Sequence, residues 1–265
     1  MAINKIEWLT ADEVTVGKFK IYCVSNLNDG YNQGSGIKRT KKHKMILKRV
    51  FWPLLKLRND LFIDGFIERE IGKLIENYIN KKSVFLEIGC GDMSLRKFIP
   101  NDLWYNAFDL ELSDFHILRV LKEKQNINIA LASATEIPIP SDTVSLIVST
   151  ETFEHIPEIE KAIQEIYRIA THNAIIICSI PNNYCKKYNI KGKNTQHINN
   201  WTFDTFIEFM KSFNIFFVKG FMKGKWISLP LWLTDTSYQL PFSSKLEFHN
   251  TNIFYVFRVN KALGD

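Results

Sequence analysis

Hydrophobic and polar positions change their period along this chain, and the changes mark out alternating strands and helices. Short apolar runs, typical of buried parallel strands, alternate with segments whose apolar side chains recur every three to four positions, as in amphipathic helices. This alternation indicates an α/β fold, a mostly parallel sheet with helices on both faces. The apolar runs predict strands at 83–88, 104–109, 127–132, 144–149, 174–180, 214–219 and 251–259. The helical spacing predicts helices at 59–80, 157–170 and 203–212.

The end of the predicted strand at 83–88 carries the first candidate chemistry. Residues 87–92 read Glu-Ile-Gly-Cys-Gly-Asp, and glycine permits a positive φ and leaves room for a ligand. A second acid, Asp109, ends the next strand twenty residues after Gly89. A glycine turn after one strand and an acid after the next is typical of nucleoside binding, with the carboxylate on the ribose hydroxyls. The third glycine of the dinucleotide fingerprint is missing, and Met93 follows the turn, which disfavours a nicotinamide dehydrogenase.

Length, charge and cysteine content narrow the class of protein only in part. The 265 residues suit one large α/β domain with appendages, and the net charge of +6 is compatible with phosphorylated substrates, nucleic acid or an anionic membrane. The first ten residues lack the apolar core of a signal peptide, and the apolar stretch at 226–234 is too short to span a bilayer. We therefore expect a cytoplasmic protein. Neither a disulfide framework nor a zinc site is indicated by the four scattered cysteines, Cys23, Cys90, Cys178 and Cys185.

Two segments stand apart from the alternating pattern. Residues 38–58 are strongly basic with interleaved aromatic and leucine residues, and residues 224–250 form an aromatic-rich insertion. We divide the chain into an N-terminal extension with this basic arm, 1–58, and a domain at 59–265 that contains the insertion. The arm can be a solvated connection, a clamp for a phosphorylated substrate or a contact with a membrane surface. The insertion can be a lid, a dimer contact or simply part of the core.

Beyond Asp109 the chain resembles the class I S-adenosylmethionine-dependent methyltransferases, in particular the small-molecule branch called type 11. The resemblance covers roughly residues 80–220. It is carried by the segments 84–92, 108–110, 133–149, 151–156 and 179–182. It implies a Rossmann-like, seven-stranded, mostly parallel sheet whose last strand is antiparallel, with S-adenosylmethionine at the C-terminal ends of the strands.

The resemblance also assigns cofactor-binding residues. It implies that the first acid and the glycine turn line the methionine and ribose, that Asp109 accepts from the ribose hydroxyls, and that Leu110 packs on the adenine. The full set is Glu87, Gly89, Cys90, Gly91, Asp109, Leu110, Ser133, Ala134, Thr150 and Glu151. Two positions depart from the family pattern: Met93 stands where many members have a small residue, and Ser133 where many have an aspartate. These departures leave open a catalytically silent protein that binds S-adenosylmethionine as a sensor or scaffold.

Methyl transfer from a sulfonium depends chiefly on positioning, although a hydroxyl acceptor must also lose its proton. The candidate bases are His155, His197 and Glu151, which follow predicted strands whose ends face the cofactor. The competing interpretation of His155 is a histidine that begins a helix and bonds to backbone. No metal-binding cluster is evident in the sequence, so we expect a metal-independent enzyme.

Together these features predict a methyltransferase that methylates oxygen on a small phosphate-bearing acceptor, such as a nucleotide-linked sugar or another cell-surface polysaccharide precursor. The phosphate preference rests on the basic arm. The alternatives are a quinone or lipid methyltransferase at the membrane surface, an RNA methyltransferase, which the absence of a recognisable RNA-binding module disfavours, and the silent binder. Peripheral membrane contact and a homodimer both stay open.

Overall fold

The computed structural model describes residues 4–9, 11–16, 19–24, 65–111, 126–185, 194–228, 237–240, 243–244 and 247–261. The basic arm at 38–58 and part of the insertion at 224–250 lie outside these residues. The strands are β1 (Ala11–Val16), β2 (Phe19–Val24), β3 (Phe85–Ile88), β4 (Tyr105–Asp109), β5 (Ile127–Leu131), β6 (Val144–Thr150), β7 (Ala170–Pro181), β8 (Ile215–Ser228), β9 (Ser237–Leu240) and β10 (Asn250–Val259). The helices are α3 (Phe66–Tyr78), α5 (Ile159–Ile169) and α7 (Phe203–Lys211), with 3-10 turns η2 (Ser94–Phe98), η3 (Phe153–His155) and η4 (Glu247–His249).

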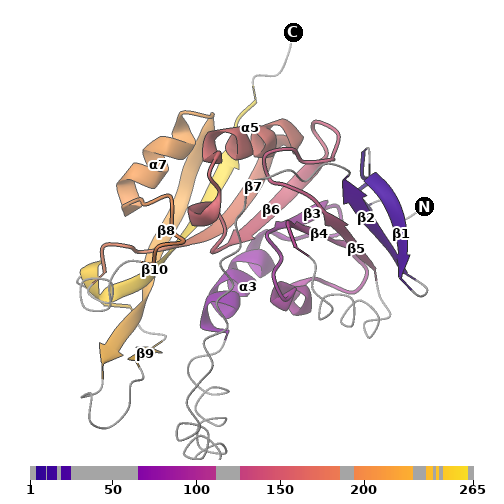
Figure 1. Cartoon of the computed structure of the whole chain (residues 1–265). Helices are drawn as coiled ribbons and strands as arrows, with labels where there is room; N and C mark the ends of the chain where they lie inside the picture. The colour runs from indigo at the N-terminus through magenta and orange to yellow at the C-terminus, as the bar shows by residue number, and fades with distance from the viewer. Residues whose placement is uncertain are drawn as a thin grey trace, which may run out of the picture.

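The described strands form one sheet in the order β1-β2-β5-β4-β3-β6-β7-β10-β8-β9 (Figure 1). The neighbours from β5 to β7 pair in parallel, and β10 is antiparallel to both β7 and β8. The predicted seven-stranded sheet with an antiparallel last strand is therefore confirmed, as the stretch from β5 to β8. The sheet is longer than predicted, because the β1–β2 hairpin pairs with β5 at one edge and β9 pairs with β8 at the other.

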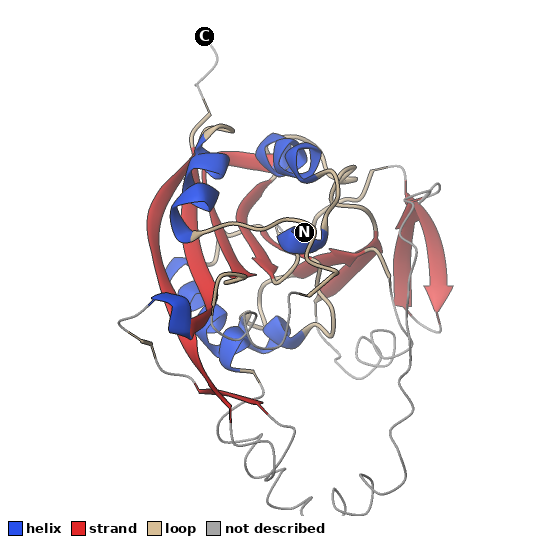
Figure 2. Cartoon of the chain, turned by 60° about the vertical axis from the view of Figure 1, so that its left-hand side comes forward, coloured by secondary structure: helices blue, strands red, loops and turns tan. Residues whose placement is uncertain are grey.

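Helices cover both faces of the sheet, as the alternating pattern predicted (Figure 2). On one face Leu86 of β3 packs in a core cluster with Ile163 of α5 and Phe206 of α7. On the other face Phe85 packs in a second cluster with Ile71 of α3. Successive side chains of a strand point to opposite faces, so β3 serves both cores and is buried on each. No helix in the described part of the chain is long and apolar enough to cross a membrane.

Several boundaries differ from the prediction. Helix α3 begins at Phe66, after Gly65 in the left-handed region at φ 81°, whereas the prediction began at 59. Strand β7 begins at Ala170, directly at the end of α5, and β8 continues to Ser228. The described part of the predicted insertion therefore largely extends the sheet, with β9 pairing back on β8.

Two buried asparagines attach the N-terminal segment 4–9 to the sheet. Asn106 of β4 accepts from the Ile6 amide at 3.0 Å and donates to the Asn4 carbonyl at 3.1 Å. Asn128 of β5 donates to the Ile6 carbonyl at 2.9 Å. Asn128 also accepts from the indole nitrogen of Trp8 at 2.9 Å. The side-chain amides of Asn106 and Asn128 thus bond to the backbone of segment 4–9, as the backbone groups of a neighbouring strand would.

Candidate functional site

A cleft of about 820 Å³ opens where β3, β4, β5 and β6 end. Parallel strands present their carboxyl ends at one edge, and ligands of open α/β sheets bind there. The loops after these strands supply most of the lining, and a segment near residue 196 closes one side. The lining residues are Ile88, Gly89, Gly91, Phe108, Asp109, Leu110, Glu111, Ala132, Ser133, Ala134, Thr135, Thr150, Glu151, Thr152, His155, Ile156, Pro157, Glu158 and Gln196.

The glycine turn forms the floor of the cleft, and its two glycines have different surroundings. Gly89 has φ 70°, and a Cβ there would overlap the side chain of Thr152. Gly91 has φ 46°, and a Cβ there would meet nothing within 4 Å. Gly89 therefore permits the turn to pack against the loop after β6, whereas Gly91 leaves open space above the backbone.

Asp109 lies beside this open space at the end of β4. Its Oδ2 accepts a hydrogen bond from the Gly91 amide at 2.9 Å, and its Oδ1 accepts from the Glu111 amide at 3.3 Å. The neighbouring Leu110 is 40% exposed at the cleft wall. The structure thus brings together the glycine, the carboxylate and the apolar side chain that the resemblance assigned to the ribose and the adenine.

Two of the predicted cofactor residues lie beneath the cleft and are absent from its lining. Glu87 is 2% exposed, and its carboxylate accepts a hydrogen bond from the Tyr105 hydroxyl. Cys90 packs in the core with Met93, and burial, reinforced by the charge of Glu87, raises the pKa of its thiol. Because the Met93 side chain is buried in that core, its departure from the family pattern does not obstruct the cleft.

Ser133 and Ala134 lie in the lining, as predicted. The Ser133 hydroxyl is 2.8 Å from the Thr135 hydroxyl and accepts from the Thr135 amide at 3.2 Å. The serine is therefore held in a local turn at the rim of the cleft.

Glu151 adopts a strained backbone conformation at the end of β6, with φ 50°. Its two carboxylate oxygens accept from the Ser179 hydroxyl at 2.8 Å and from the Asn252 amide at 3.0 Å. These bonds tie the strained residue to the ends of β7 and β10. Next to it, the buried Thr150 hydroxyl has no hydrogen-bond partner among the described residues, so it can bond to a ligand in the cleft.

The charged side chains of the lining are mostly acidic. Asp109, Glu111, Glu151 and Glu158 line the cleft, and no lysine or arginine is among the described residues that line it. Such a lining attracts a positively charged ligand and repels a phosphate.

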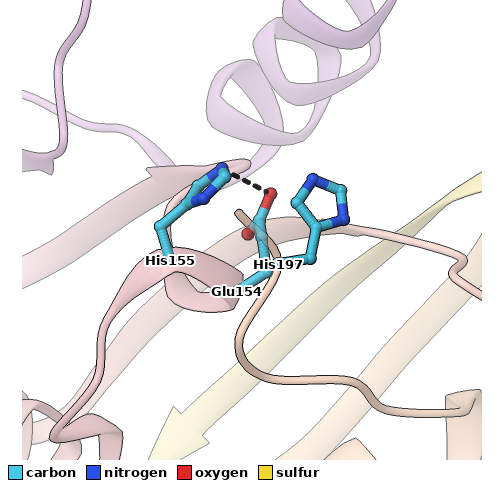
Figure 3. Close-up of side chains that lie close together, drawn as sticks. All are labelled: Glu154, His155 and His197. Carbon is cyan, nitrogen blue, oxygen red and sulfur yellow. Dashed lines mark ion pairs between the residues drawn. The ribbon is translucent and has the colours of Figure 1, made fainter. Parts of the chain in front are cut away.

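His155 and His197, predicted from sequence as alternative bases, lie together, with their ring centroids 5.1 Å apart (Figure 3). His155 donates from Nδ1 to the Gln196 carbonyl at 2.9 Å, so the backbone contact considered for it is present. The sequence did not single out Glu154, whose carboxylate stands between the two rings. Glu154 is 1% exposed, and burial together with repulsion from Glu151 raises its pKa well above the ordinary range. No pattern in the sequence distinguishes this buried acid from an exposed one.

Comparison with known proteins points to a methyltransferase domain, in agreement with the nucleoside-binding geometry of the cleft. Residues 86–178 match the family described as a methyltransferase domain. Over this segment the chain is similar to a methyltransferase domain. The match begins in β3 and ends in β7, so it spans the glycine turn, Asp109 and η3.

The curated relatives of this methyltransferase segment include a ubiquinone/menaquinone biosynthesis C-methyltransferase from Rickettsia bellii. It is 29% identical over 133 residues, which are 46% of this chain and 54% of the relative. The chain therefore spans about half the length of the curated relatives it matches.

Solved structures of low sequence identity share the fold. An S-adenosylmethionine-dependent methyltransferase from Methanosarcina mazei aligns with a TM-score of 0.56 at 11% identity, covering 71% of this chain and 98% of its own. A 1,6-didemethyltoxoflavin-N1-methyltransferase from Burkholderia thailandensis, solved with S-adenosylhomocysteine, aligns with a TM-score of 0.53 at 10% identity, covering 84% and 92%. The resemblance to class I methyltransferases is thus confirmed for family and fold.

Proposed function

We propose that this protein is an S-adenosylmethionine-dependent methyltransferase that acts on a small molecule. The arrangement of Gly91 and Asp109 carries the proposal. Open space above a glycine backbone lies beside a carboxylate at the carboxyl edge of adjacent parallel strands, in a cleft whose charged lining is mostly acidic. A carboxylate there can accept from ribose hydroxyls, and the acidic lining favours a cationic sulfonium over a neutral or anionic cofactor.

In this proposal the methyl group points toward Thr150 and Glu151, at the end of β6. The acceptor oxygen attacks the methyl carbon in line with the sulfur. The oxygen–carbon bond forms as the carbon–sulfur bond breaks, and the electron pair of that bond stays on sulfur. The acceptor proton passes to solvent or to a nearby base, and S-adenosylhomocysteine leaves. Positioning the two reactants supplies much of the acceleration.

The acceptor is proposed from charge and from the activity of relatives. A phosphate-bearing acceptor methylated on oxygen, such as a nucleotide-linked sugar, rests on the basic residues 38–58, which lie outside the described residues. The acidic side chains among the described lining residues oppose phosphate binding there, so we place any phosphate of the acceptor outside the cleft. A second candidate, C-methylation of a quinone at a membrane surface, is favoured by the activity named for the Rickettsia relatives. Tritiated S-adenosylmethionine with nucleotide sugars in solution, or with a demethylated quinol in liposomes, separates the two.

Calorimetric titration of S-adenosylhomocysteine tests cofactor binding. We expect binding by the full chain, and a loss of affinity of about 10- to 100-fold in Asp109→Ala, since a hydrogen bond to a charged group is worth about 1.5–3 kcal/mol. Asp102→Ala, at an exposed loop outside the cleft, is the matched control. Absence of binding, or equal affinity in the Asp109 variant, would contradict the proposed cofactor site.

A further inference from the structure

Two histidines and one carboxylate converge where residues 194–200 cross η3 (Figure 3). One potential ligand atom from each of Glu154, His155 and His197 lies within 4.8 Å of the others. The crossing is fixed by backbone bonds, since the Glu154 carbonyl accepts from the Ile198 amide at 2.8 Å and the Asn199 amide at 3.1 Å. Residues distant in sequence are therefore held together by the fold.

Both imidazoles are oriented through the same ring nitrogen. Nδ1 of His155 donates to the Gln196 carbonyl at 2.9 Å. Nδ1 of His197 donates to Oδ1 of Asn183 at 2.8 Å, and Asn183 is buried. In each neutral ring the lone pair that a metal needs is then on Nε2. Histidines that bind metals in proteins are typically oriented in this way, by a hydrogen bond from the other ring nitrogen.

The carboxylate between the rings lacks part of its hydrogen bonding. Oε2 of Glu154 is buried and has no hydrogen-bond partner among the residues that the structure describes. In that same part of the chain its one ion-pair contact is with His155, where Oε1 lies 3.6 Å from Nε2. A buried carboxylate in such surroundings is costly unless it is protonated or coordinates a cation.

We propose that Glu154, His155 and His197 bind a divalent transition-metal ion of the Zn²⁺ type. Two imidazoles with one carboxylate suit Zn²⁺, Co²⁺ or Fe²⁺, whereas Mg²⁺ and Ca²⁺ prefer oxygen ligands alone. Ligands of a tetrahedral Zn²⁺ lie about 3.3 Å apart, given metal–ligand bonds of about 2.0–2.1 Å. The Glu154–His155 pair is already close to this spacing, so the cluster needs only a modest contraction. The proposal replaces the metal-independent enzyme expected from the sequence.

Three protein ligands leave at least one coordination position for another group. His155 and Gln196 line the same cleft as Gly91 and Asp109, so the ion borders the proposed cofactor site. This step rests on the proposed function: the remaining position holds the acceptor oxygen. The metal lowers the pKa of that hydroxyl, its proton passes to solvent, and the oxygen is oriented toward the methyl group.

Metal binding is measured on the full chain after chelator treatment, without S-adenosylmethionine. Zn²⁺ is titrated by competition with a chromogenic chelator, and Co²⁺ is followed by its visible absorption. We expect one ion per chain, a Co²⁺ spectrum typical of low coordination number, and no competition by Mg²⁺. Acetohydroxamate, a small chelating probe, shifts the Co²⁺ bands if a position is open. Unchanged bands would show that no coordination position is open. Failure of the unaltered chain to bind Zn²⁺ or Co²⁺ would overturn the proposed metal site.

Variants locate the ion. We expect Glu154→Gln and His197→Gln each to weaken Zn²⁺ binding at least 100-fold, and Asn183→Ala, which removes the bond that orients His197, to weaken it about 10- to 100-fold. His172→Gln, at an exposed histidine outside the cluster, is the matched control. Equal affinity in all four variants would place the ion elsewhere and overturn the proposal. Circular dichroism establishes that each variant is folded.

The two proposals fail separately. Binding of S-adenosylhomocysteine in the presence of chelator, with no metal bound in its absence, refutes the metal site and leaves the cofactor site standing. Metal binding without any binding of S-adenosylhomocysteine refutes the proposed function and leaves the metal site standing.

Discussion

The Gly91 amide donates a hydrogen bond to Oδ2 of Asp109, at 2.9 Å, and so joins the turn after β3 to the end of β4. The bond fixes the carboxylate beside the open space above Gly91. A nucleoside that passes over Gly91 can then donate its ribose hydroxyls to the Asp109 carboxylate, which needs the two residues at this spacing. The hydrogen bond therefore holds the proposed cofactor site in place before any ligand binds.

Alanine substitutions at the two glycines of the turn should separate an effect on stability from an effect on ligand binding. Gly89→Ala combines positive φ with overlap of Thr152, so we expect it to lower the free energy of unfolding by about 2 kcal/mol or more. Gly91→Ala meets open space and carries only the conformational cost of about 1–2 kcal/mol, but its methyl group enters the cleft. Urea unfolding and calorimetry test this pair. A Gly91→Ala protein with undiminished affinity for S-adenosylhomocysteine would contradict the placement of the ligand.

The Glu151 carboxylate should favour the positively charged sulfonium of S-adenosylmethionine over the uncharged thioether of S-adenosylhomocysteine. This carboxylate lines the cleft near the proposed sulfonium. Glu151→Gln should therefore weaken the binding of S-adenosylmethionine more than the binding of S-adenosylhomocysteine. A partly screened interaction of about 1 kcal/mol corresponds to a fivefold change in the ratio of the two dissociation constants. Glu160→Gln, at an exposed position outside the cleft, should leave the ratio unchanged. Parallel titrations of both ligands measure it, and an equal ratio in both variants would argue against a sulfonium at this end of the cleft.

Much of this site follows from local sequence, and some of it does not. Gly89, Gly91 and Asp109 are recognisable because they lie at the ends of apolar runs that predict two successive strands. His155 and His197 are also found from their positions after strands. Glu154 is not, because its burial depends on residues 194–200 folding over η3, which is a contact between distant segments. The metal site consequently becomes visible only in three dimensions.

In the fold, too, local patterns were predictable from the sequence and contacts between distant segments were not. The apolar periods predicted the seven central strands and both helical layers. They did not predict the attachment of residues 4–9, because Asn106 and Asn128 are polar residues inside strands whose partners are backbone groups distant in sequence. Nor did they predict the length of β8, whose mixed residues 220–228 are held as a strand by pairing with β10 and β9.

The asparagine attachment gives a prediction about stability. Asn106→Ala would leave the Ile6 amide and the Asn4 and Phe85 carbonyls without a side-chain partner in a buried region. We expect the free energy of unfolding to fall by about 2–4 kcal/mol. Asn126→Ala, which removes an exposed bond to the Asn101 carbonyl, should change it by less than about 0.5 kcal/mol. Urea denaturation compares the two, and equal losses would show that segment 4–9 contributes little.

Glu165 of α5 gives a prediction about pH. Burial opposes its ionisation, but hydrogen bonds from Arg168 and from the Ile137 amide outweigh burial and lower its pKa below 4.5. A lowered pKa means that the carboxylate stabilises the native state fully above the unfolded value of 4.5, and that this contribution is lost as the pH falls through the folded pKa. Glu165→Gln should therefore cost about 1 kcal/mol at pH 7 and progressively less as the pH falls below 4.5. Glu208→Gln, in an exposed pair with Lys211, should show neither effect, and a cost for Glu165→Gln that is independent of pH would contradict the assignment.

A crystal structure of the full chain with S-adenosylhomocysteine would locate the ligand relative to Asp109. We expect both ribose hydroxyls to lie within hydrogen-bond distance of the Asp109 carboxylate. We also expect the nucleoside to pass over Gly91, the adenine to contact Leu110 and Ser133, and the sulfur to face Thr150. A ligand bound away from Asp109, or crystals that stay empty at saturating ligand, would contradict the proposed cofactor site.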